Sequence, residues 1–184
     1  MLIRHASRRW SSPIICLFLL AFAGIPGGAA AAGRDTPPQA VTGPQHITAP
    51  QAIAGPQAIL AAVNTARAAA GLPALYWDMR LATAAARQAA DLQTCGQLSH
   101  TGCDGSDLAR RLRLANYPYR AGAENLALCA CDAAAVVGLW MDSAGHRRNL
   151  LSAAVEALGA DVRRDTGDPR RVLWVLVLGK PAME

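Results

Sequence analysis

This sequence of 184 residues has few aromatic residues, no long hydrophobic run and a small net charge. Only 5% of the residues are aromatic, whereas 52% are hydrophobic, and many of those are alanine. The high apolar fraction excludes a fully disordered chain, and the alanine content favours a helix-rich core with few rings. The length suffices for one ordinary domain and a tail, because domains most often contain about 100–150 residues.

The apolar runs are too short for a membrane-spanning helix, which needs roughly 20 residues. The run Ile14–Ile25 has 12 residues, follows a basic segment and precedes the alanines at 29–32. This order is typical of a secretory signal with an Ala-x-Ala cleavage site. We therefore predict a signal peptide over residues 1–32, a secreted, periplasmic or cell-surface location, and no transmembrane segment in the mature chain. An uncleaved N-terminal anchor is the alternative.

Positive charge is also low once the signal is set aside. Lys and Arg number 18 against 13 acidic residues, and removal of Arg4, Arg8 and Arg9 leaves fifteen basic residues. The remaining net charge of +2 provides no electrostatic footprint for non-specific nucleic-acid binding. We therefore exclude nucleic acid as a partner.

Cysteines are few, and one of the five, Cys16, lies in the signal. The four that remain are Cys95, Cys103, Cys129 and Cys131. An even number in an oxidising compartment predicts two disulfides, for which three connectivities exist. A bridge between Cys129 and Cys131 would close a small, strained ring, so we favour cross-bridges from the 95/103 loop to the 129/131 segment. The alternative is a zinc site formed by these cysteines with His100.

A short repeat separates the signal from the domain. Residues 36–59 contain four six-residue copies, each with Pro-Gln followed by Ala or His and then Val or Ile. Proline at this spacing prevents a helix, and a polyproline II conformation would align the prolines on one face. We predict a disordered N-terminal tail whose Pro/Gln/Ala-rich linker, residues 33–56, acts as a semi-rigid spacer. A docking strip for a partner is the alternative.

Residues 57–184 have the patterns of one mixed domain. Helices are predicted over about 57–70, 79–93, 107–115 and 133–143, with a helical turn over 146–151, and strands over 155–162 and 172–178. Asp78, Ser106 and Asp132 are the predicted N-caps. The last strand is almost wholly apolar, so we expect helices to cover both faces of its sheet, which is an α+β fold.

Titratable residues gather at three breaks between these elements. His100 lies in Ser99-His100-Thr101, Glu124 in the segment 122–126, and His146 in the segment 140–149. Two histidines and one glutamate in a secreted domain can converge as a metal site or as an acid/base pair.

Together the three segments resemble the bacterial branch of the CAP superfamily, which comprises cysteine-rich secretory proteins, antigen 5 and plant pathogenesis-related proteins. The segments follow the family's order, and Asn64-x-x-Arg67-x-x-x-Gly71-Leu72-Pro73 matches the family's usual start. The resemblance covers about residues 57–180. It implies a three-layer α-β-α sandwich, which agrees with the fold class expected from the patterns.

The resemblance also implies a central cleft lined by two histidines and two acidic residues, which holds zinc or another divalent ion in some members. His100 and His146 match the histidines and are the implied metal ligands, and Glu124 matches the first acid. Ser143 stands where many members have the second acid, which leaves at most a His-Glu-His ligand set. Asn125 and Asn149 are implied to orient the ligands, and Trp140 to pack in the core.

The function expected from this resemblance is that of a secreted, non-catalytic CAP domain. Its cleft would bind a divalent metal or a small ligand outside the cytoplasm, and a lipid or cell-wall component is the other class of partner. One alternative is a metal-dependent hydrolase, including a protease, that uses Glu124 as base and His100 and His146 as ligands. No serine of these motifs lies in a Gly-x-Ser-x-Gly elbow, so no nucleophile is identified.

A structural or adhesive module is the third function class. It would use three arginine pairs to contact an anionic wall polymer: Arg147-Arg148, Arg163-Arg164 and Arg170-Arg171.

Overall fold

The computed structural model describes residues 55–182. The predicted signal and the repeat segment up to residue 54 lie outside the described residues. The described elements are, in order, α1 (Ala58–Ala69), β1 (Tyr76–Trp77), α2 (Met79–Cys95), α3 (Leu108–Leu114), β2 (Tyr119–Cys129), α4 (Ala133–Asp142), α5 (Ala144–Leu150), β3 (Ala157–Arg164) and β4 (Val172–Pro181). Between residues 55 and 182, none of the helices combines the length and the apolar character needed to cross a bilayer.

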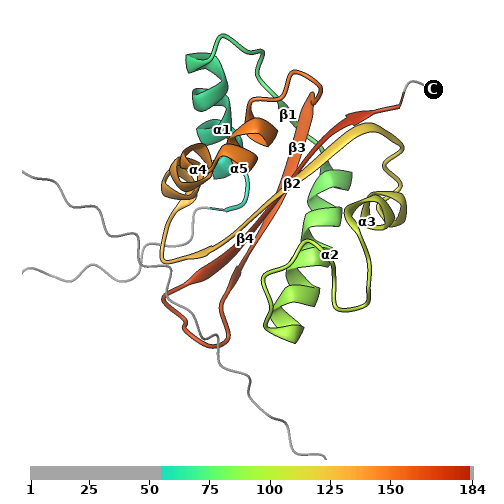
Figure 1. The fold of residues 1–184 in the computed structure, drawn as a ribbon, viewed down its shortest axis with the longest axis vertical. Helices are drawn as coiled ribbons and strands as arrows, with labels where there is room; N and C mark the ends of the chain where they lie inside the picture. The colour runs from blue at the N-terminus through green and yellow to red at the C-terminus, as the bar shows by residue number, and fades with distance from the viewer. Residues whose placement is uncertain (1–54, 183–184) are drawn as a thin grey trace, which may run out of the picture. The chain divides into compact units, whose positions relative to one another are not determined.

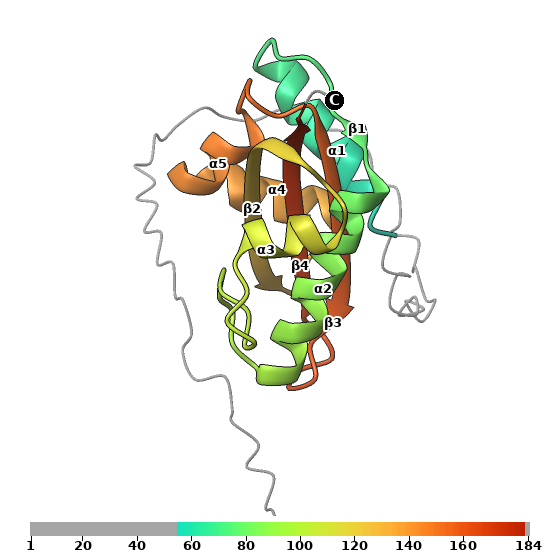
Figure 2. The ribbon, with the colours of Figure 1, turned by 90° about the vertical axis from the view of Figure 1, so that its right-hand side faces the viewer.

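A four-stranded sheet lies between two groups of helices (Figure 1). The strand order is β1-β3-β4-β2, in which β4 is antiparallel to both of its neighbours and β1 is parallel to β3. Helices α1, α4 and α5 cover one face and helices α2 and α3 cover the other, as the view turned by 90° also shows (Figure 2). This three-layer α-β-α arrangement confirms the predicted fold.

Strand β4 connects the two hydrophobic cores. Its residues from Val172 to Gly179 are all buried. Because successive strand residues face opposite sides, one set of side chains packs with the helices on each face. Trp174, Leu176 and Leu178 belong to the core beneath α1 and α4, whereas Leu173, Val175 and Val177 belong to the core beneath α2 and α3. The expectation of a strand covered on both faces is therefore confirmed.

Aspartate side chains cap three of the helices. Asp78 and Asp132 accept hydrogen bonds from first-turn backbone N–H groups of α2 and α4, as predicted. The cap of α3 is Asp107, whose carboxylate accepts from the Arg110 N–H at 2.7 Å, so the prediction of Ser106 was wrong by one residue. Ser106 instead belongs to the preceding turn, where its N–H donates to the Asp104 carboxylate at 2.8 Å.

Helix α2 packs directly on the sheet because small residues meet there. A Cβ atom added to Gly159 of β3 would overlap the backbone nitrogen of Ala82 and lie 2.7 Å from its Cα. The α2 face that meets the sheet includes buried alanines at 82, 84, 85 and 89. The alanine content noted in the sequence therefore allows a close helix–sheet contact.

Two residues of the opening motif fix α1 to the rest of the domain. The Asn64 side chain makes two hydrogen bonds with the backbone of Leu75, at 2.9 and 2.8 Å. Arg67 is fully buried and donates to the carbonyls of Leu150 and Ser152 at 2.8 and 2.9 Å. Arg67 therefore also positions the end of α5, the helix that carries His146.

Candidate functional site

His100 and Glu124 form a direct hydrogen bond between two different elements. His100 lies in the loop between α2 and α3, and Glu124 lies in the middle of β2. The imidazole Nδ1 is 2.9 Å from Glu124 Oε1. The His100 side chain is 60% exposed, whereas that of Glu124 is 3% exposed. One edge of the ring is therefore held by a buried carboxylate, while the rest of the ring faces solvent.

Arg111 of α3 completes this arrangement from inside the protein. Its guanidinium is 2% exposed and donates to Glu124 Oε2 at 2.8 Å. It also donates to the backbone carbonyls of His100 and Ser106, at 3.1 and 2.9 Å. Both Glu124 oxygens are therefore occupied, one by Arg111 and one by His100, and the backbone of the His100 loop is held by the same guanidinium.

The motif comparison did not identify Arg111, but helical spacing could have done so. Arg111 follows Leu108 by three residues and precedes Ala115 by four, which places it on the apolar face of the α3 segment. A charged residue on that face is rarely buried unless it is paired, so it requires a buried partner.

Asn125 and Asn149 connect β2 to the segment that carries His146. The Asn125 side chain is fully buried and donates to the His146 carbonyl at 3.2 Å. Asn149 of α5 donates to the Asn125 side chain at 2.9 Å and to the Glu124 carbonyl at 3.3 Å. The strand that carries Glu124 thereby also fixes the start of α5.

The environments of the two histidines shift their pKa values in opposite directions. The hydrogen bond to Glu124 raises the pKa of His100, although partial desolvation opposes this. Burial lowers the pKa of His146, and the positive charge of a protonated His100 lowers it further. His146 is therefore kept neutral near pH 7, which suits a metal ligand or a proton acceptor.

Ser143 and Trp140 lie beside this site without contributing a titratable group. Ser143 separates α4 from α5, is half-buried and makes no side-chain cap for α5. Trp140 is buried in the core beneath α4, and its indole N–H donates to the Leu126 carbonyl at 3.1 Å. The implied core role of Trp140 agrees with these contacts.

The disulfides differ from the predicted pairing. The bonds join Cys95 to Cys103 and Cys129 to Cys131, so the predicted cross-bridges are wrong. The Cys129–Cys131 pair closes at the end of β2 with a Cα–Cα distance of 5.3 Å, within the range that a disulfide accepts. The argument from ring size failed because the chain turns sharply after β2. The zinc alternative is also excluded in this oxidised state, because all four sulfurs are bonded in pairs.

Most of the paired arginines have partners within the domain. Arg163 pairs with Asp161, Arg170 with Asp168, and Arg171 with Asp165. Arg164 and Arg147 donate to the carbonyls of Pro169 and Met141. Three of the six arginines, Arg164, Arg170 and Arg171, therefore make contacts within the turn between β3 and β4.

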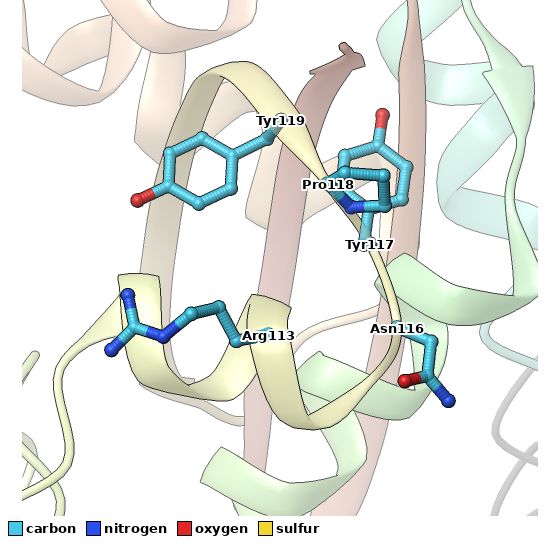
Figure 3. Close-up of a pocket in the computed structure, with 5 residues that line it drawn as sticks. All are labelled: Arg113, Asn116, Tyr117, Pro118 and Tyr119. Atoms are coloured by element: carbon cyan, nitrogen blue, oxygen red, sulfur yellow. The ribbon is translucent and has the colours of Figure 1, made fainter. Parts of the chain in front are cut away.

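A separate hollow of about 390 Å³ lies between α3 and the start of β2. Figure 3 shows its lining residues, Arg113, Asn116, Tyr117, Pro118 and Tyr119. The side chains of Arg113 and Tyr119 extend to the same side, and the ring of Tyr117 lies behind Pro118 (Figure 3). Burial raises the pKa of the Tyr117 phenol, which keeps it neutral as a packing group. This hollow includes none of the residues singled out by the motifs.

Comparison with known proteins connects this arrangement to one family. The model of the family described as "CAP: Cysteine-rich secretory protein family" matches residues 60–178. A relative from Bacillus subtilis (strain 168), named "Uncharacterized membrane protein YlbC", is 32% identical over 105 residues. That match covers 57% of this chain but only 30% of the relative, so the chain spans less than a third of that protein's length.

Solved structures give the same result for the fold. An extracellular protein containing an SCP domain from Bacillus anthracis is 27% identical with a TM-score of 0.61, over 67% of this chain and 39% of that chain. An outer surface protein from Borrelia burgdorferi is 21% identical with a TM-score of 0.62, over 68% of this chain and 92% of that chain. The second likeness is one of fold alone.

Proposed function

Because the chain belongs to the cysteine-rich secretory protein (CAP) family, we propose that it is a non-catalytic CAP domain that binds a divalent metal through His100 and His146 outside the cytoplasm. The observation that carries this proposal is the 2.9 Å contact between His100 Nδ1 and Glu124. Histidines that bind a metal commonly donate their other ring N–H to a carboxylate, which fixes the tautomer and the ring orientation. With its proton on Nδ1, His100 offers the lone pair of Nε2 to an ion.

Glu124 acts in this proposal as an anchor for His100 and not as a ligand. Its two oxygens already accept hydrogen bonds from His100 and Arg111. Neither oxygen therefore needs an ion as a further partner. Without Glu124, the His-Glu-His set implied by the resemblance is reduced to His100 and His146, which are the ligands of this proposal. The same contacts argue against Glu124 as the general base of a hydrolase, since each of its oxygens already accepts a hydrogen bond within the protein and the carboxylate is buried.

Location outside the cytoplasm is supported by the disulfides of this chain and by the descriptions of two relatives. Two disulfides among four cysteines are typical of an oxidising compartment. The Bacillus anthracis relative is described as extracellular, and the Bacillus subtilis relative as a membrane protein. We propose a secreted or surface-attached chain, exported by the predicted signal over residues 1–32.

Zinc titration of the purified oxidised protein by calorimetry tests the metal proposal. We expect the substitutions His100→Ala and His146→Ala each to weaken zinc binding, and Glu124→Gln to weaken it by about 10–100-fold because the ring loses its anchor. His46→Ala, which removes an imidazole from the repeat segment, is the matched control and should bind like the wild type. A double His100→Ala, His146→Ala protein that binds zinc as tightly as the wild type would show the proposal to be wrong.

A hydrolase screen on the same proteins tests the non-catalytic assignment. The zinc-loaded wild type and the double histidine variant should have equal background rates on peptide and ester substrates. Turnover that depends on both histidines would overturn the assignment and favour the hydrolase alternative.

A further inference from the structure

We propose a second, redox-gated metal site at the end of α2, formed by Asp91, Cys95 and Cys103 after reduction of the Cys95–Cys103 disulfide. One ligand atom from each side chain lies within 4.8 Å of the other two, the two sulfurs being joined in the disulfide and an Asp91 carboxylate oxygen lying beside them. Among residues 55–182, this is the only group of three or more His, Cys, Asp or Glu side chains with that property. The site shares no ligand with the proposed His100–His146 site and is independent of it.

The fold gathers these ligands by contacts that do not involve the disulfide. Asp91 and Cys95 are four residues apart on α2, so their side chains lie on one face of the helix. Cys103 approaches from the loop, where its backbone N–H donates to the Asp91 carboxylate. Its Sγ also lies 3.9 Å from the Asp91 carbonyl. These contacts would hold the Asp91 carboxylate near the Cys103 sulfur once the disulfide is opened.

The donor set selects a borderline or soft divalent metal. Two thiolates and one carboxylate are ligands that Zn²⁺ and Co²⁺ accept, with a fourth position left to water. The carbonyl end of a helix favours positive charge, and the last turn of α2 contains no basic residue, although Arg87 and Arg111 line the adjoining hollow. Asp91 also lines an open hollow of about 390 Å³, which leaves room for that water.

The chemical step is thiol–disulfide exchange with a dithiol reductant. Cys103 is exposed, so an external thiolate can attack the bridge and form a mixed disulfide, which releases the other cysteine as a thiol. The second thiol of the reductant then displaces the remaining cysteine, and the reductant leaves as a cyclic disulfide. The chain has gained two electrons and two protons. Binding of the metal releases those two thiol protons, so the ion replaces the disulfide in closing the loop around His100.

The second disulfide provides a matched control within the same chain. Cys129 and Cys131 are two positions apart in the sequence. The same reductant would open their disulfide and produce a second pair of thiols. Within the described residues, however, they are not part of any group of three potential ligands. Reduction should therefore create thiolate metal binding at 95/103 and not at 129/131.

Cobalt titration tests the proposal, because thiolate ligands give a charge-transfer absorption that imidazole ligands do not. The full chain is reduced with a dithiol, freed of reductant without oxygen, and titrated with Co²⁺. We expect no thiolate band from the oxidised protein, and in the reduced protein we expect the thiolate band to saturate with one Co²⁺ per chain, separately from any ion at the His100–His146 site. A Cys129→Ser, Cys131→Ser variant should retain the band, a Cys95→Ser, Cys103→Ser variant should lose it, and Asp91→Asn should weaken binding by about tenfold or more.

Alkylation of the reduced wild type gives a readout that does not depend on how the variants fold. With Zn²⁺ present, Cys95 and Cys103 should be protected and Cys129 and Cys131 modified, as read by peptide mass spectrometry. A His100→Ala, His146→Ala protein should keep this protection, which separates the present site from the proposed function. Absence of the band from the reduced wild type, persistence of the band without Cys95 and Cys103, or equal modification of all four cysteines would overturn the proposal.

Discussion

At the scale of single residues, Arg111 stabilises the domain by pairing with a buried carboxylate. Its guanidinium neutralises Glu124, and both side chains are almost fully buried. Replacement by methionine would leave the carboxylate buried with one hydrogen bond fewer. We expect Arg111→Met to lower the free energy of unfolding by about 3–5 kcal/mol, as for other broken buried pairs. Urea unfolding at pH 7 measures the change.

The control for this substitution is Arg113→Met, two residues along the same helix and exposed. It should change the free energy of unfolding by no more than about 0.5 kcal/mol. Adding Glu124→Gln to Arg111→Met should recover part of the loss, because the unpaired charge is removed. Equal urea midpoints for the two arginine variants would contradict the assignment of Arg111.

The opposite pKa shifts of the histidines predict two separate titrations. His100 should titrate above the ordinary value of 6.5 and His146 below it. Protonated His100 favours the folded state, so its contribution is complete below 6.5 and is lost as the pH rises through its raised pKa. Protonation of His146 disfavours the folded state, so that contribution is lost as the pH falls from 6.5 towards its lowered pKa.

NMR titration of the imidazole ring protons measures both midpoints. Glu124→Gln should move the His100 midpoint back towards 6.5 because the charge-assisted hydrogen bond is lost. Coincident midpoints in the wild type, or no movement in the variant, would contradict this account. Zinc binding should weaken on acidification, since protons compete for the same ring nitrogens.

The contact between His100 and Glu124 could be anticipated from sequence because motifs carry both residues, whereas their role in a site stays a prediction. His100, Glu124 and His146 stand in short segments whose joint order is specific, and the contact between His100 and Glu124 agrees with their predicted convergence. The roles of the two Glu124 oxygens could not be predicted, because they depend on Arg111, which reaches the site only when α3 packs against β2. Side-chain direction across a tertiary contact is not encoded in the spacing of one segment.

At the scale of secondary-structure elements, α2 and β3 approach so closely that a Cβ atom on Gly159 would overlap backbone atoms of α2. Gly159→Ala should destabilise the protein by about 1–3 kcal/mol or more, because backbone atoms of Leu81 and Ala82 already occupy the space that the added Cβ would need. Thermal unfolding followed by circular dichroism measures the change.

Gly138→Ala in α4 is the matched control, since a Cβ there meets nothing within 4 Å. It should stabilise the protein by about 0.5–1 kcal/mol, and equal destabilisation by both changes would refute the packing argument.

Elements with local signals were predicted better than those formed by pairing. The aspartate caps and apolar periodicity locate α2 and α4 to within a few residues, and the unbroken apolar run locates β4. Strand β2 was not predicted, because Gly122, Glu124 and Asn125 interrupt any alternation. That segment becomes a strand by pairing with β4 along its length, which is a long-range property. The disulfide pairing was wrong for a related reason, because the turn after β2 sets it.

At the scale of the whole molecule, the mature chain should begin near Gly33. The alanines at 29–32 are the fitting site for a signal peptidase, and the basic segment with its apolar run precedes them. Mass spectrometry of the exported protein should therefore find no peptide from residues 1–32. Recovery of an intact Met1–Ala32 segment would show instead that the N-terminus is retained as an anchor.

The side-chain contacts along β2 have a consequence for how copies of this domain behave at high concentration. Strand β2 is at one edge of the sheet, where free carbonyls would normally invite a strand from another chain. The carbonyls of Glu124 and Leu126 are already occupied by Asn149 and Trp140. These two motif residues thus occupy carbonyls to which an additional strand could bond, which disfavours edge-to-edge association of two copies of the domain.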